Sequence, residues 1–148
     1  MTSSGVIRHD VNGVFGIVSG PGGTVASIAV ANSSDVWVAS STGGFRYLAS
    51  TKSWEQHCPE VAGCGVGFGT VVASNGGMST TDVWFTTGTG GAGAPYYLDQ
   101  TALSATNSLV GVTASLRSIA TGGVGDVWGV ATSGTLVQFQ AAYAALGQ

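Results

Sequence analysis

The triplet Asp-Val-Trp occurs three times in this chain, in the stretches NSSDVWVAS, STTDVWFTT and GVGDVWGVA. The three aspartates, Asp35, Asp82 and Asp126, lie 47 and 44 residues apart in a sequence of 148 residues. A self-similar period of about 40 to 50 residues is typical of propeller blades and of solenoid units. The repeat therefore restricts the chain to an architecture built from similar units.

Each triplet lies between short segments in which β-branched and aromatic residues alternate with small or polar ones. VASIAVANSS precedes the first triplet, GFRYLAS follows it, and Gly or Ser clusters bound the segments. Alternation with a period of two, bounded by turn residues, predicts antiparallel strands. Each unit reads as three strands joined by turns, with KSWEQHC as a fourth strand in the first unit and AAYAALGQ as its counterpart in the last. Helical composition is confined to YAALGQ, which is too short for a stable helix.

The triplet itself has a structural interpretation. An aspartate just before a strand accepts hydrogen bonds from backbone N–H groups one or two residues further on, and so closes the preceding turn. The tryptophan two residues later shares a sheet face with the aspartate and buries a large area against the next unit. We therefore assign the triplet residues to maintenance of the fold, with direct ligand binding as the alternative: Asp35, Trp37, Asp82, Trp84, Asp126 and Trp128.

A resemblance to a known group of proteins follows from these motifs. An alternating strand, Ser/Thr-x-Asp-Val-Trp, a Gly turn, a strand ending near His-Asp, then Gly and an aromatic strand resembles the bacterial Asp-Val-Trp repeat propellers. These are relatives of the Asp-box (bacterial neuraminidase-type) repeat families. The outer-strand Trp of the family appears only as Trp54, and Phe15 and Tyr143 stand at the other such positions. The resemblance implies an all-β fold with β-propeller-type blades of four antiparallel strands, and it implies little about function, because propellers include enzymes, lectins and scaffolds.

The phase of the repeats predicts an incomplete propeller. We expect a single domain over residues 1–148, with a half repeat at 5–20 and repeats at about 24–58, 69–104 and 115–148, or about three and a half blades. Closed propellers typically have about four to eight blades. The apolar end faces, at 7–17 and 136–143, then require a cover. We expect a homo-oligomer or a second polypeptide that completes the propeller, with an interface above about 2,000 Å², unless the chain is a fragment of a longer protein.

Composition excludes several classes of partner. Charged residues make up 7% of the chain and its formal net charge is −3, so no basic stripe is present to bind nucleic acid. Apolar runs such as VASIAVA are far shorter than the roughly 18 residues of a membrane-spanning helix. The N-terminal stretch MTSSGVIRHD has neither the basic nor the apolar region of a secretory signal. We therefore expect no nucleic acid partner and no membrane span.

Two cysteines, Cys58 and Cys64, bracket the stretch CPEVAGC. Pro59 and Gly63 supply the turn chemistry that brings their sulfur atoms together, which favours a disulfide. Reduced structural thiols and a metal or redox role remain the alternatives. His57 is adjacent, but the paired cysteine spacing of a structural zinc site is missing, so we expect no metal. A disulfide would favour an extracellular or periplasmic location.

Three known catalytic or cofactor-binding patterns can be compared with the sequence. A sialidase-like site needs converging arginines with a Tyr-Glu pair, but Arg8 and Arg46 occupy equivalent third strands and Arg117 a first strand, so we assign them as solvated surface charges. The stretch GTGGAG matches a dinucleotide fingerprint only by letters, because no helix follows it. Ser-His-Asp chemistry lacks a nucleophile elbow. We predict no enzyme, no catalytic residues and no cofactor; the residues of the rejected sialidase-like set are Arg8, Arg46, Arg117, Tyr47, Glu55 and Glu60.

The favoured function is a non-catalytic propeller scaffold for protein interaction or self-assembly. The alternative is a glycan-binding, lectin-like module, because abundant Ser, Thr, Asn and Gly with a few aromatic rings suit ligands rich in hydroxyl groups. Its candidate ligand-binding residues are Tyr96, Tyr97 and Trp54. A remote alternative is a fragment of a sialidase-like glycoside hydrolase.

Overall fold

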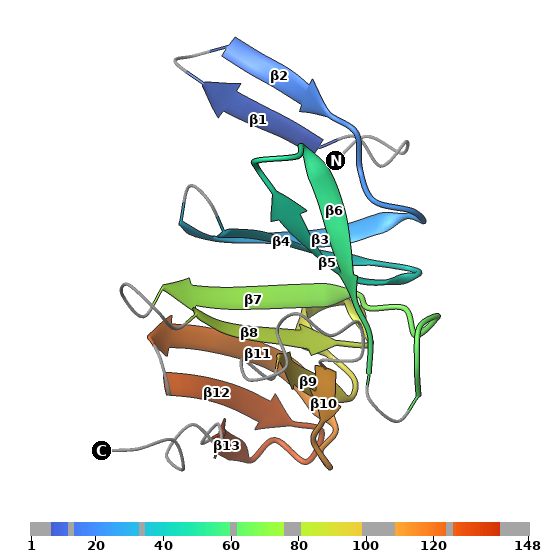
Figure 1. The fold of residues 1–148 in the computed structure, drawn as a ribbon. Coiled ribbons are helices and arrows are strands. Elements are labelled where there is room, and N and C mark those ends of the chain that lie inside the picture. Colours follow the sequence, from blue (N-terminus) through green and yellow to red (C-terminus); the bar gives the residue numbers. More distant parts are fainter. Residues whose placement is uncertain are drawn as a thin grey trace, which may run out of the picture.

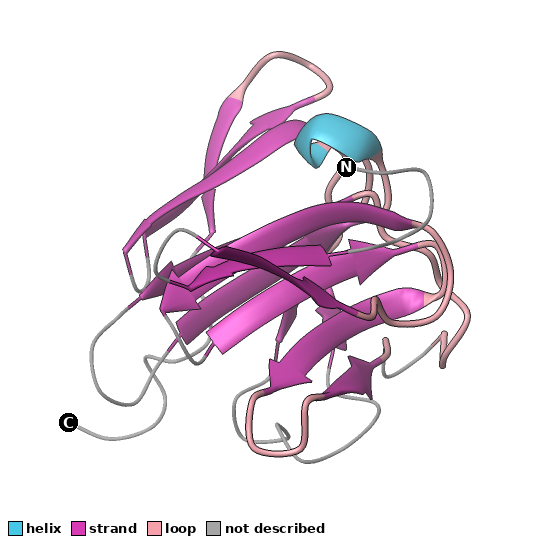
Figure 2. Ribbon diagram, turned by 90° about the horizontal axis from the view of Figure 1, so that it is seen from above, coloured by secondary structure: helices cyan, strands magenta, loops and turns pink. Residues whose placement is uncertain are grey.

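The chain is described by a computed structural model. It describes residues 7–11, 14–32, 35–59, 62–75, 81–98, 109–123 and 126–139. Within these ranges the fold consists of antiparallel sheets, and the only helical element is the short 3-10 turn η1 (Thr89–Gly91) (Figure 2). The all-β prediction is confirmed.

Four sheets follow one another along the chain, and in each one consecutive strands are neighbours. The first is the hairpin of β1 (Ile7–Val11) and β2 (Val14–Val18). The second contains β3 (Val25–Asn32), β4 (Asp35–Ser40), β5 (Gly43–Leu48) and β6 (Ser53–His57). The third contains β7 (Thr70–Asn75), β8 (Thr81–Thr86), β9 (Pro95–Leu98) and β10 (Leu109–Gly111). The fourth contains β11 (Leu116–Gly123), β12 (Asp126–Ala131) and β13 (Leu136–Phe139).

The sheets are stacked face to face in chain order, as Figure 1 shows from the hairpin at the top to β13 at the bottom. Their first strands lie side by side, since β3 contacts β7 and β7 contacts β11. At the first of these contacts Ser27 Oγ lies 3.4 Å from the carbonyl oxygen of Val71, and the backbone N–H of Val71 donates to Ser27 Oγ at 3.3 Å. The first strand of each repeat therefore lies on a common side of the stack.

The core forms two apolar layers, one in each space between the larger sheets. Because side chains alternate between the faces of a strand, each sheet supplies one set of residues to each neighbour. Full burial of one large apolar side chain contributes about 1.5 to 3 kcal/mol. The layer between the second and third sheets contains Trp37, Ala39, Phe68, Val71, Val83, Phe85, Leu98 and Leu109. The layer between the third and fourth sheets contains Trp84, Leu116, Ile119 and Val127.

Gly44 allows the second and third sheets to approach closely. A Cβ atom at this position would lie 2.7 Å from Cζ of Phe85, inside van der Waals contact. The ring of Phe85 therefore packs directly over the backbone of β5, and it also makes a T-shaped contact with Trp37, with ring centroids 6.2 Å apart. Any side chain at position 44 has to displace this ring.

The segment after β6 links the outer strands of the second and third sheets. Cys58 and Cys64 are joined by a disulfide. The backbone N–H of Leu109 donates to the carbonyl oxygen of Cys58 at 2.9 Å, and Pro59 forms a bridge with the same leucine. Cys58 is buried, so the disulfide holds the loop where it contacts β10.

The structure modifies the expectation for the triplets. Each aspartate was predicted in a turn, but Asp35 and Asp126 are the first residues of β4 and β12, and Asp82 lies within β8. Predicted burial is confirmed for Trp37 and Trp84, which are 1% and 2% exposed, and it is wrong for Trp128, which is 43% exposed. The reason is that a following sheet covers the first two tryptophans. The predicted last strand over AAYAALGQ, the residue Tyr143 and the end of the repeat at 69–104 lie outside the described residues.

Candidate functional site

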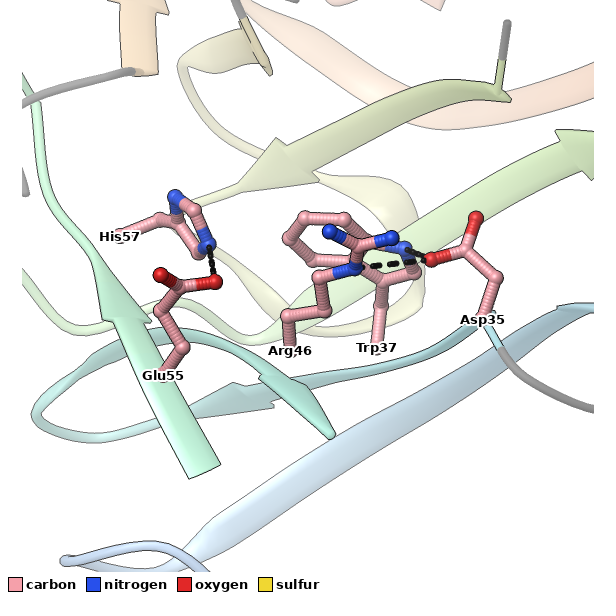
Figure 3. Close-up of polar contacts among 5 residues, drawn as sticks. All are labelled: Asp35, Trp37, Arg46, Glu55 and His57. Atoms are coloured by element: carbon pink, nitrogen blue, oxygen red, sulfur yellow. Dashed lines mark hydrogen bonds and ion pairs between the residues drawn. The ribbon is translucent and has the colours of Figure 1, made fainter. Parts of the chain in front are cut away.

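Charged side chains gather on one face of the second sheet. Trp37, Arg46 and Glu55 are direct neighbours across β4, β5 and β6. Asp35 precedes the tryptophan by two residues and His57 follows the glutamate by two, so the period of two places all five on the face toward the third sheet. Figure 3 shows this row, with two groups of polar contacts along it.

The first group is centred on the carboxylate of Asp35. Its Oδ1 accepts a hydrogen bond from Trp37 Nε1 at 2.9 Å and one from Arg46 Nε at 3.2 Å (Figure 3). The guanidinium carbon of Arg46 also lies 5.7 Å from the centroid of the Trp37 ring, within cation–π range. Asp35 is buried, and a buried carboxylate is tolerated when donors and a counter-charge replace water. The carboxylate therefore binds two side chains, whereas the sequence predicted backbone donors.

The second group pairs a buried histidine with a half-buried carboxylate. Nε2 of His57 lies 3.4 Å from Oε2 of Glu55, and the imidazole centroid lies 5.2 Å from that of Trp37 (Figure 3). Desolvation by burial lowers the pKa of His57 below its ordinary value of 6.5, the Glu55 carboxylate opposes this shift, and Arg46 adds a smaller lowering. Desolvation is the largest cause, so burial favours the neutral form of the imidazole.

This arrangement is suited to holding two sheets together. General acid–base catalysis needs a reactant within hydrogen-bond reach of the titrating group, yet His57 is enclosed against an indole ring and only Arg46 and Glu55 reach solvent. Across the described ranges, no cluster of three or more His, Cys, Asp or Glu residues could hold a metal ion. We interpret these five side chains as a row of polar contacts within the apolar interface between the second and third sheets.

The sequence reasoning missed the role of Arg46. It was assigned as a solvated surface charge, and that assignment is wrong, because its side chain is only 28% exposed and pairs with Asp35. The two-residue turn at Ser41 and Thr42 sets the register that places the arginine directly opposite Trp37, so the contact could be found only once that register was known. Arg117 is exposed on β11 in another sheet. Among the remaining members of the sialidase-like set, Tyr47 pairs with Trp54 on the sheet face opposite Glu55, and Glu60 and the side chain of Arg8 lie outside what the structure describes.

The three predicted ligand-binding aromatics lie in separate places. Tyr96 packs against Phe68, with centroids 5.4 Å apart, in the space between the second and third sheets. Tyr97 is the next residue of β9 and therefore points to the opposite face, where it contacts Trp84 at 5.5 Å. Trp54 lies on β6, donates its Nε1 hydrogen to the carbonyl oxygen of Ser19 at 2.7 Å, and packs against Tyr47. The structure does not bring the three together.

The fourth sheet has an exposed apolar face, where the sequence predicts an apolar end face at 136–143, but the sequence did not predict that Trp128 would be exposed there. Val127 is fully buried toward the third sheet, so Trp128 points the other way, where it is 43% exposed. Leu136 pairs with Val130 on this outer face and is 68% exposed. We call the surface formed by these two exposed side chains the Trp128 face.

On the side away from the third sheet, the second sheet is partly covered, because Val38 and Phe45 point to this side and are 0% and 7% exposed. Ser27 and Ala29 of β3 face the third sheet, so the alternating residues Ile28 and Val30 point outward, and they are 43% and 60% exposed. We call the surface of these two side chains the Val30 face. Figure 1 shows the hairpin β1–β2 on the same side of the second sheet, where Trp54 donates its hydrogen bond to Ser19.

A scan against protein-family models and a search of curated proteins find no match to this chain. No helix in the described part of the chain has the length and apolarity needed to cross a membrane.

Proposed function

We propose that this chain is a non-catalytic scaffold that binds a protein surface through the Trp128 face. One observation carries the proposal. In the first two triplet sheets the tryptophan face is covered by the next sheet, whereas in the third triplet sheet the same face is exposed. A further β-sheet surface at this position would bury Trp128 as Trp37 and Trp84 are buried.

The chemistry of the Trp128 face supports protein binding. The Nε1 hydrogen of Trp128 is donated to Oδ1 of Asp126 at 2.6 Å, which fixes the orientation of the ring before any partner binds. Tryptophan is enriched among the residues that dominate binding energy at protein interfaces. Contiguous exposed apolar surface on a folded chain marks an interaction site more often than a scattered exposed residue does.

We further propose that the sheets are blades of a partial β-propeller. The proposal is supported by the repeated triplets, by the meander order of each sheet and by the side-by-side first strands β3, β7 and β11. Such first strands would surround the axis of a closed ring. The Cys58–Cys64 disulfide supports action in an oxidising compartment, outside the cytosol.

A photocrosslinking experiment tests the proposed binding face. A photoreactive amino acid replaces Leu136 in the full chain, which is produced in its native cells and irradiated. We expect a covalent adduct with a protein. The matched control carries the same photoreactive group at Thr89, an exposed position in η1 away from the Trp128 face. Absence of any adduct at 136, or equal adducts at both positions, would contradict the proposed function.

Glycan binding is a second candidate, supported by one aromatic pair. The rings of Tyr47 and Trp54 lie with centroids 5.1 Å apart at an interplanar angle of 54° and are only half-buried. Sugar faces stack on such rings. A glycan array would support this candidate if the chain binds a specific sugar and Trp54→Ala abolishes that binding. Loss of the same binding in Tyr96→Ala or Tyr97→Ala would place the sugar at those tyrosines. No binding to any sugar would eliminate it.

A further inference from the structure

The first triplet shows how this chain holds a guanidinium group. Oδ1 of Asp35 accepts hydrogen bonds from the Trp37 indole at 2.9 Å and from Nε of Arg46 at 3.2 Å (Figure 3). The guanidinium carbon of Arg46 also lies 5.7 Å from the centroid of the indole ring. A carboxylate and the face of an aromatic ring therefore bind the same cation. The aspartate and the tryptophan of the triplet act together as a guanidinium-binding pair.

The third triplet has the same pair without an arginine. Trp128 Nε1 donates to Oδ1 of Asp126 at 2.6 Å, and both residues are exposed. The residue opposite the indole on β13 is the neutral Gln138, whereas Arg46 occupies that position in the second sheet. In the part of the chain that the structure describes, no ion pair involves Asp126. Its carboxylate is thus available to a cation from solution.

The second triplet also places a planar group against its indole. Tyr97 is the residue of β9 opposite Trp84, and their ring centroids lie 5.5 Å apart. The neighbouring strand therefore supplies a phenol ring to one buried indole and a guanidinium group to the other. Among the described residues, no ring or guanidinium group lies against the Trp128 indole. This indole can accept a planar group from another molecule.

The cations of the chain lie away from Asp126. Arg117 is near the start of β11, whereas the residue paired with Asp126 is Gly123, at the end of that strand. Lys52 belongs to the turn between β5 and β6, and Arg8 belongs to β1 at the other end of the stack (Figure 1). The remaining arginine is paired within the first triplet. The formal net charge of the chain is −3, which favours the approach of a basic surface.

We infer that the Trp128 face binds an arginine side chain presented by a partner protein. The guanidinium group stacks on the Trp128 indole and pairs with the Asp126 carboxylate, in the arrangement of the first triplet. Arginine is favoured over lysine because its planar group can stack on a ring and donate to a carboxylate at the same time. The inference rests on the proposed function, since it names the chemistry of the partner at the same face.

Peptide titrations of the full chain test this chemistry. The probe is an acetylated, amidated pentapeptide with one arginine among alanines, and the matched probes carry lysine or citrulline in its place. Citrulline keeps the planar shape but is neutral. The indole N–H signal of Trp128 in NMR spectra, assigned through Trp128→Phe, reports binding. We expect the arginine peptide to bind about fivefold more tightly than the citrulline peptide, with the lysine peptide between them, and added salt to reduce the difference.

Two variants assign the preference to this site. Asp126→Asn keeps an acceptor for the indole hydrogen but removes the charge, so the preference for arginine over citrulline should fall to about twofold or less. Gln138→Arg supplies a guanidinium group of the chain itself, at the position that Arg46 has in the second sheet, and should block the peptide. Thr89→Arg adds the same charge at an exposed position in η1 and should bind as the unaltered chain does. Thermal unfolding verifies that each variant is folded.

Other results overturn the inference. Absence of peptide binding, or equal binding of the arginine and citrulline peptides, would exclude a guanidinium site. Tighter binding of lysine than of arginine would indicate a contact without stacking. A preference that persists in both Asp126→Asn and Gln138→Arg would place the site elsewhere. In each case the proposed function would stand if the photoreactive group at position 136 still captures a protein, whereas absence of that adduct would contradict the proposed function itself.

Discussion

The first and third Asp-Val-Trp triplets adopt the same local structure in different surroundings. Trp37 Nε1 donates to Asp35 Oδ1 at 2.9 Å, and Trp128 Nε1 donates to Asp126 Oδ1 at 2.6 Å. However, Trp37 is 1% exposed and Trp128 is 43% exposed. The Asp–Trp bond therefore forms within the strand without help from a neighbouring sheet. Burial is a separate property that only the neighbouring sheet supplies.

In the second triplet the indole is buried, but no bond from its N–H to the aspartate is seen. Trp84 is 2% exposed, but its Nε1 has no hydrogen-bond partner among the described residues. Opposite the three tryptophans, the next strands place Arg46, Tyr97 and Gln138. Only the arginine adds a counter-charge to its triplet aspartate. The repeated triplet thus determines the direction of the indole, and the residue opposite the indole determines whether the aspartate has a counter-charge.

The largest expected effect comes from removing the buried indole. Trp37→Ala should lower the free energy of unfolding by about 3 to 5 kcal/mol, because it leaves a cavity between two sheets. Trp128→Ala should cost about 1 kcal/mol or less in the monomer, since its ring is half solvated. Urea unfolding of both variants measures the difference. Equal losses would show that the indole contributes mainly through its bond to aspartate.

Removing the aspartate tests how much its hydrogen bonds contribute to stability at the buried and the exposed triplets. Asp35→Ala leaves a buried indole N–H without its acceptor and Arg46 without its counter-charge, so we expect a loss of about 2 kcal/mol. Asp82→Ala should cost about 1 to 2 kcal/mol through the donors that it leaves unpaired. At the exposed third triplet, Asp126→Ala should change stability by about 0.5 kcal/mol or less. If Asp126→Ala were as damaging as Asp35→Ala, solvent exposure would not explain the contrast.

Gly44 and Leu136 provide a smaller test of the same contrast. Gly44→Ala introduces a Cβ 2.7 Å from the Phe85 ring, and the resulting overpacking should cost about 1 to 2 kcal/mol. Leu136→Ala, at the corresponding exposed position, should stay within about 0.5 kcal/mol in the monomer. Thermal unfolding measures both. A neutral Gly44→Ala would mean that the second and third sheets can separate at no cost.

The features of the fold that depend on a single strand could be predicted from the sequence. Period-two alternation identified the strands around each triplet and placed the tryptophan and aspartate on one face, because side-chain direction depends only on position within the strand. Pairing between strands was harder. The contact of Arg46 with Asp35 needs the register of β4 on β5, and a length of turn that differs by one residue would put the arginine on the other face.

The arrangement of the sheets was the least predictable part. Three similar triplets gave no sign that Trp128 would differ from Trp37 and Trp84 in exposure, because the difference lies in what covers each sheet. Burial of His57 likewise depends on how the second sheet meets the third. The aromatic candidates Tyr96 and Tyr97 were grouped by adjacency in sequence, whereas adjacent residues of a strand face opposite sides of the sheet.

The smallest expected effect is a difference in acid sensitivity between the two sheet contacts. The contact that contains Trp37 also contains His57, whose pKa is lowered mainly by desolvation, while the apolar layer around Trp84 has no titratable side chain other than Tyr97 among its described members. Because the folded pKa lies below the unfolded value of 6.5, the unfolded chain binds more protons as the pH falls below that value. The free energy of unfolding should therefore decrease from about pH 7.5 to about pH 5.5.

Two variants assign this acid sensitivity to one imidazole. His57→Gln should remove part of the pH slope, whereas His9→Gln, which alters the other histidine of the chain, should retain it. Urea unfolding at each pH gives the slope, and amide hydrogen exchange reports where protection is lost first. We expect β4 and β5, beside His57, to lose protection before β8 and β12. Stability that increases toward low pH, or a slope that disappears only in His9→Gln, would show that burial of His57 does not control this contact.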